Sequence, residues 1–132
     1  MLSDELLPVV RNMTLMERIL MWFQQDGAPP HFDRRVRAFL DTYLHNQWIG
    51  RQGPVPWPPR SADLTPLDFY LWGYLKSVVY DPQPSTIAQL KVNIRMAIAG
   101  ITAETLEKVM ANCLKRMTLC KQQNGEHFEH LL

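Results

Sequence analysis

Hydrophobic and polar positions along the N-terminal part of the chain alternate between helical and extended patterns. Residues 3–12 predict a short helix with Ser3 as its N-cap and acidic side chains in its first turn. Thr14 and Glu17 then have the spacing of a capping box for one further helical turn. The almost wholly apolar segment 20–24 predicts a short buried strand.

A second helix and a second strand follow. Segment 31–46 carries apolar residues on one helical face, and these are Val36, Phe39, Leu40, Tyr43 and Leu44. Segment 47–49 predicts another short strand. Residues 50–59 are rich in proline, and we expect a long loop without regular structure there.

The remainder of the chain has a helical pattern. Thr65-Pro66 opens a helix that we expect to end near Val79, with threonine as the cap and proline at the first helical position. Two further helices are predicted, one from Ser85 or Thr86 to a stop at Gly100, and one from Thr102 to a stop before Asn124. The pattern therefore predicts a mostly helical α/β chain with about two short parallel strands and a helical C-terminal region.

Chain length, net charge, apolar runs and cysteine spacing limit the classes of function that the sequence allows. The chain of 132 residues has the length of one ordinary domain, and its net charge of +1 gives no whole-molecule attraction to nucleic acid. No apolar run is long enough to span a membrane, so we expect no membrane partner. Cys113 and Cys120 are seven positions apart on a predicted helix, too far for a disulfide, which favours a reducing compartment.

Two acidic side chains are the candidates for chemistry. Asp26 directly follows the first predicted strand, and Asp68 lies in the first turn of a predicted helix. Carboxylates that meet at the carboxyl edge of a parallel sheet are able to bind divalent metal ions, which polarise a phosphodiester and activate water. On spacing alone a simpler interpretation stays open, in which Asp26 forms a turn and Asp68 stabilises a helix N-terminus.

The sequence around both acids resembles the DDE/D transposases of the mariner superfamily. Gln25-Asp26-Gly27-Ala28-Pro29-Pro30-His31 is similar to the segment that carries the second catalytic carboxylate of that family. Segment 57–72, with Asp68 as its later acid, is similar to the segment that carries the third, whereas Asp63 matches a loop residue. Forty-one residues separate Asp26 from Asp68, which suits a mariner-like branch. The closing residues 124–132 also resemble the tail of such transposases.

The resemblance implies a ribonuclease-H-like fold in which three carboxylates bind Mg²⁺ or Mn²⁺ and cut and rejoin transposon ends. Asp26 and Asp68 would be the catalytic, metal-binding residues. Asp4 and Glu5 match no first-carboxylate motif, so we expect residues 1–132 to be the C-terminal part of the catalytic domain, without its first three strands and without the N-terminal DNA-binding region. We expect such a fragment to be inactive alone and to work in the nucleus.

Basic residues near the two motifs are the candidates for DNA contact. Arg34, Arg35 and Arg37 form a cluster after Asp26, either as a solvated helix face or as partners of DNA phosphates. The resemblance adds Arg60 and also His31, which could orient Asp26 or contact phosphate. We expect weak, sequence-independent DNA binding and self-association through the strand at 20–24. A second function class stays open, a retained non-catalytic nucleic-acid-binding or protein-interaction module that does not need Asp26 or Asp68.

Overall fold

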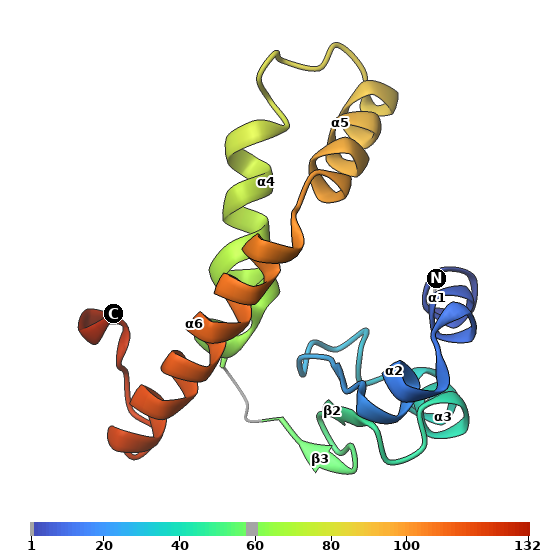
Figure 1. The fold of residues 1–132 in the computed structure, drawn as a ribbon, viewed down its shortest axis with the longest axis vertical. Coiled ribbons are helices and arrows are strands. Elements are labelled where there is room, and N and C mark those ends of the chain that lie inside the picture. The colour runs from blue at the N-terminus through green and yellow to red at the C-terminus, as the bar shows by residue number, and fades with distance from the viewer. Residues whose placement is uncertain (1, 58–60) are drawn as a thin grey trace. The chain divides into compact units, whose positions relative to one another are not determined.

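The chain folds into two compact units, Met1–Ser61 and Ala62–Leu132 (Figure 1). A computed structural model describes residues 2–57 and 61–132. Within these ranges, every helix is too short or too polar to cross a membrane. The two motif acids belong to different units, Asp26 to the first and Asp68 to the second, and each unit is described by itself.

The first unit opens with short helices whose starts follow local hydrogen bonding. A π-helical turn, Leu2–Leu6, continues into α1 (Leu7–Asn12), and α2 (Leu15–Leu20) follows. The predicted helix is present, but Ser3 lies inside it and donates its hydroxyl to Asp4 at 2.9 Å, so Ser3 as N-cap was wrong. The capping box is confirmed, because Thr14 and Glu17 exchange backbone-to-side-chain hydrogen bonds of 3.3 and 2.7 Å.

Three short parallel strands form the sheet of the first unit. Strand β1 (Phe23–Gln24) pairs with β2 (Trp48–Gly50), which pairs with β3 (Val55–Pro56). Helix α3 (Arg34–Tyr43) connects β1 to β2, as the parallel pairing of two successive strands requires. The predicted parallel strands are therefore confirmed, with one strand more than expected.

One strand prediction and one loop prediction were wrong in extent. The segment 20–24 is not a buried strand, because Leu20 is the last residue of α2 and is 70% exposed. Helix α2 extends to Leu20, which leaves two residues for β1. Residues 50–59 were expected to have no regular structure, yet β3 lies there in register with β2. Its Pro56 donates no backbone hydrogen bond, and accordingly β3 is at the edge of the sheet.

The core of the first unit lies between α3, β2 and α1. Leu40 of α3 and Leu44, the residue that caps this helix, are almost completely buried, and Val10 and Trp48 pack with them. The indole N–H of Trp48 donates to Asp41 at 3.0 Å, which satisfies the one polar group of this buried side chain. Tyr43 continues the same stripe in sequence but is half exposed, since it lies at the edge of the packed face.

Helices make up the second unit. A short 3₁₀ helix, η2 (Ala62–Leu64), precedes the π-helical turn η3 (Leu67–Leu71), which continues directly into α4 (Trp72–Val78). Helices α5 (Ile87–Ala99) and α6 (Ala103–Gln122) follow, and the 3₁₀ turn η4 (Glu129–Leu131) closes the chain. Helix α5 returns alongside α4 as a hairpin (Figure 1).

The predicted helix starts of the second unit are confirmed at Thr86 and Thr102. Each side chain accepts a hydrogen bond from the backbone N–H three residues further on, at 3.1 and 3.2 Å. Burial is uneven among the apolar side chains of these helices. Among the buried residues are Leu64, Leu75, Val79, Val109, Cys113 and Phe128, whereas Ile98 of α5 is 46% exposed. The chain is thus a mixed, mainly helical α/β protein with a small parallel sheet.

Candidate metal and nucleic-acid site

Asp26 lies at the carboxyl edge of the sheet in the first unit. Strand β1 ends at Gln24, and the backbone N–H of Gln25 still donates to Ile49 of β2 at 2.9 Å. The chain then leaves the sheet at Asp26, whose side chain is 39% exposed. The carboxyl ends of parallel strands are the usual position of functional groups in α/β proteins. The sequence prediction of an acidic side chain at this position is therefore confirmed.

The carboxylate of Asp26 is held through one oxygen. Its Oδ1 accepts the backbone N–H of Ala28 at 3.0 Å and lies 2.5 Å from Nδ1 of His31. Because a carboxylate only accepts, Nδ1 of His31 carries the hydrogen in this contact. Among the described residues, Oδ2 of Asp26 has no hydrogen-bond partner. This arrangement fixes the direction of the carboxylate and leaves one oxygen for a cation.

The same contacts keep Asp26 ionised. Partial burial raises the pKa of Asp26, but the Ala28 N–H and the His31 ring together outweigh burial and bring the pKa below its ordinary value of 3.8. A carboxylate that stays charged at neutral pH is the form that binds divalent cations. Of the two roles left open for His31, orienting Asp26 is the one that this contact supports.

Asp68 occupies the first turn of the helix that η3 and α4 form. Its backbone N–H donates to the carbonyl of Thr65 at 2.9 Å, and its side chain is exposed. The position agrees with the prediction from Thr65-Pro66. An acid in the first turn also interacts favourably with the helix dipole, so this placement alone is compatible with a purely structural role.

Helix α6 holds the segment that precedes Asp68. The guanidinium of Arg116 donates to the carbonyl of Asp63 at 2.8 Å and lies 4.4 Å from the ring centroid of Phe69. The thiol of Cys113 donates to the carbonyl of Leu64 at 3.6 Å. The start of the Asp68 helix is therefore fixed by residues about fifty positions further along the chain, which sequence reasoning did not identify.

The predicted basic cluster divides into side chains with different surroundings. Arg35 makes a bidentate contact with Asp33, at 3.1 Å for both hydrogen bonds, and is therefore already neutralised locally. Arg34 is exposed. Arg37 instead donates to Gln52 at 3.2 Å and lies over the ring of Phe32. Arg60 was also predicted to contact DNA, and it lies outside the described residues.

Arg51 is a basic residue at this edge that sequence reasoning missed. It directly follows β2, and the parallel pairing of β1 with β2 brings the ends of both strands to one edge. A methyl group at Gly27 would lie 3.6 Å from Cδ of Arg51, so the arginine stem passes beside the turn that carries Asp26. The signal was present in the sequence as a basic residue directly after the second predicted strand.

A cavity of about 640 Å³ opens next to His31. Its wall combines charged and apolar side chains, namely Leu2, Ser3, Gln25, Pro30, His31, Asp33, Arg35, Val36 and Phe39. Within residues 2–57 and 61–132, no group of three or more histidine, cysteine or acidic side chains is arranged to hold a metal ion.

Comparisons of the chain with protein families, with curated proteins and with solved structures gave no match. The functional interpretation consequently depends on the motif residues and on their surroundings in the structure.

Proposed function

We propose that this chain is part of the catalytic domain of a DDE/D transposase of the mariner superfamily, with a ribonuclease-H-like fold. Asp26 and Asp68 are its second and third metal-binding carboxylates, and the cofactor is Mg²⁺ or Mn²⁺. The observation that supports this most is the Asp26 turn, which combines the family-like segment 25–31 with a carboxylate at a parallel strand end and one unpartnered oxygen. Such a protein acts on DNA in the nucleus.

The side chains of Asp26 and Asp68 are of the chemical type that binds Mg²⁺ or Mn²⁺. Carboxylate oxygens are the ligands that Mg²⁺ prefers, and the bound ion would polarise a phosphodiester and lower the pKa of a bound water. Asp26 would supply Oδ2, while His31 and the Ala28 N–H keep the carboxylate in place through Oδ1. Asp68 would supply an exposed carboxylate from the first turn of its helix.

We expect the 132-residue polypeptide by itself to leave DNA uncut. The two motif carboxylates are fewer than the three that the family uses to hold a pair of metal ions roughly 3.5–4 Å apart. Incubation of supercoiled plasmid with the chain and Mg²⁺ or Mn²⁺ tests this expectation. Robust nicking that disappears in Asp26→Asn would contradict it.

A chimera tests the proposed function directly. Residues 1–132 replace the corresponding segment of an active mariner-superfamily transposase, and excision of a marked transposon from a plasmid is measured. We expect excision by the chimera and its loss in Asp26→Asn and Asp68→Asn. Asp63→Asn is the matched control, because the structure assigns Asp63 a role through its backbone carbonyl, which the substitution keeps. A chimera without excision, or one indifferent to both motif substitutions, would contradict the proposal.

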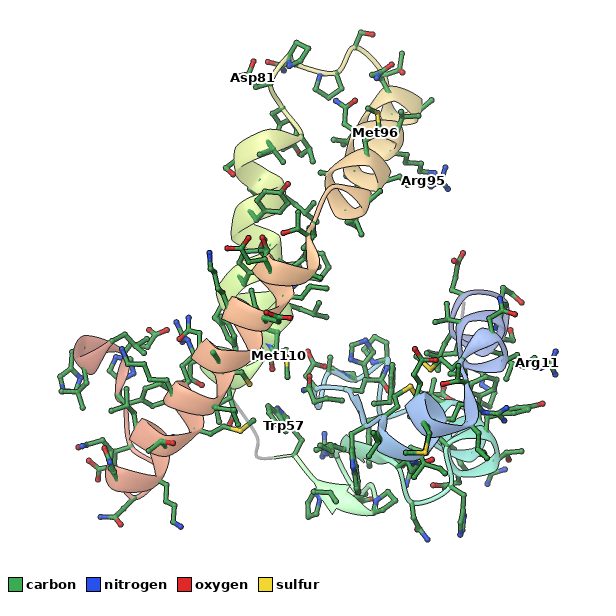
Figure 2. All side chains as sticks on the ribbon, viewed as in Figure 1. Arg11, Trp57, Asp81, Arg95, Met96 and Met110 are labelled. Atoms are coloured by element: carbon green, nitrogen blue, oxygen red, sulfur yellow. The ribbon has the colours of Figure 1, made fainter. Side chains whose placement is uncertain are left out.

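Exposed apolar side chains favour one alternative function, a non-catalytic interaction module. Met96 of α5 and Met110 of α6 are 69% and 56% exposed and project from their helices (Figure 2). Methionine is enriched on surfaces that bind other proteins. Two results together would favour this alternative. The chimera would show no excision, and the chain would still bind another protein after simultaneous Asp26→Asn and Asp68→Asn.

A further inference from the structure

Two arginines lie against the same aromatic ring beside Asp26. The guanidinium carbon of Arg37, from α3, is 4.6 Å from the ring centroid of Phe32, and that of Arg51, from the loop after β2, is 4.3 Å from it. Phe32 belongs to the same segment between β1 and α3 as Asp26 and His31. Neighbouring cations repel each other, so a ring flanked by two guanidiniums is an arrangement that an anion would stabilise.

Nothing acidic neutralises this arginine pair among the residues that the structure describes. The described ion pairs use other cations, and neither Arg37 nor Arg51 contacts a carboxylate. The one described polar contact of Arg37 goes to the neutral amide of Gln52, and its buried Nε has no partner. Arg35, two residues before Arg37, differs in this respect because Asp33 already binds it.

The surroundings hold both side chains in place before any ligand binds. The ring of Phe32 supports both guanidiniums, and the stem of Arg51 passes beside Gly27, with its Cδ 3.6 Å from where a methyl group on residue 27 would lie. Planar guanidiniums that are already oriented lose less conformational freedom on binding than free surface arginines. Phosphate oxygens are the anions that match their planar array of donors.

We propose that Arg37 and Arg51 bind the phosphodiester backbone of DNA next to Asp26. The choice of DNA rests on the proposed function, whereas the choice of a phosphodiester rests on the arginine pair itself. This site replaces the cluster of three neighbouring arginines as the main DNA contact of α3. It also places a bound phosphate on the same turn as the carboxylate that would hold the metal ion.

The salt dependence of DNA binding tests the proposal. A short fluorescein-labelled duplex is titrated with the full chain at several salt concentrations, in EDTA, and followed by fluorescence anisotropy. Each phosphate contact makes the slope of log K against log salt more negative by about 0.9. Arg37→Gln and Arg51→Gln should therefore each make the slope less negative by about one, and the double variant by about two. Arg11→Gln, at an exposed arginine of α1 in the same unit, should leave the slope unchanged.

A second measurement on the unmodified chain guards against variants that fail to fold. Phenylglyoxal modifies accessible arginines, and mass spectrometry locates the products. Bound duplex should protect Arg37 and Arg51 and leave the exposed Arg11 reactive. Inorganic pyrophosphate and a single-stranded RNA of equal length are added as competitors. Protection by pyrophosphate without protection by duplex, or tighter binding of the RNA, would overturn the assignment to DNA.

A wild-type slope in the double variant together with unprotected arginines would overturn the site itself. These outcomes do not depend on whether the chain is a transposase, because the anisotropy titration and the phenylglyoxal protection use neither metal ions nor DNA cleavage. An inactive chimera with a protected arginine pair contradicts only the transposase proposal. An active chimera with an unprotected pair contradicts only the phosphate site.

Discussion

Replacement of Arg116 by methionine should destabilise the second unit by about 2–4 kcal/mol. The substitution removes a hydrogen bond from a charged donor to the Asp63 carbonyl, which contributes about 1.5–3 kcal/mol, and a cation–π contact with Phe69, which contributes about 0.5–2 kcal/mol. The ion pair with Glu129 adds little, because its atoms are 3.7 Å apart and Glu129 is half exposed. Methionine also removes the buried Nε that has no partner, which lowers the net cost.

Urea unfolding followed by far-UV circular dichroism measures this loss. Lys115→Met is the matched control, since Lys115 is the exposed neighbour of Arg116 on α6 and lysine, arginine and methionine have similar helix propensities. The control should unfold like the wild type, and Glu129→Gln should cost less than about 1 kcal/mol. Equal midpoints for Arg116→Met and Lys115→Met would refute the role of Arg116 in holding the segment before Asp68.

Three further predictions concern glycine, pH and thiol reactivity. Gly53→Ala should lower the unfolding midpoint of the chain, because the new methyl group would lie 2.7 Å from the buried indole ring of Trp48. Gly73→Ala is the control, because a methyl group at this helical position meets no other atom, and it should be neutral or stabilising by roughly 0.5–1 kcal/mol. Asp26→Asn should destabilise the chain above about pH 4, where the wild-type carboxylate is ionised. The urea midpoints of wild type and variant should converge as pH falls through the lowered pKa of Asp26. Protonation then removes the interactions of the carboxylate in the wild type as well. Burial raises the pKa of the Cys113 thiol, although nearby Arg116 opposes the shift. Iodoacetamide should therefore label Cys120 before Cys113 in the folded chain. Equal labelling rates of the two thiols before unfolding would contradict this.

Short-range patterns in the amino-acid sequence were sufficient to locate most helices and the Asp26 turn. The capping threonines Thr14, Thr86 and Thr102 each bond to a backbone N–H three residues away, so the chemistry that starts each helix lies within one turn of the chain. Asp26 follows a short apolar run, and its position at a strand end was predictable for the same reason. Strand length was less predictable, because only pairing with β2 decided which of residues 20–24 became extended.

The contacts that shape the candidate sites depend on tertiary structure. Arg51 passes beside the Asp26 turn because β1 and β2 pair in parallel, and Arg116 reaches Asp63 because α6 packs on η2. Both contacts join residues far apart along the chain, and no local spacing predicts such pairs. The same holds for the basic cluster, in which Arg35 is bound by its neighbour Asp33 while Arg37 turns to Phe32 and Gln52. Helix caps depend on neighbours in sequence, but the charge left free for a ligand depends on which long-range partners the fold supplies.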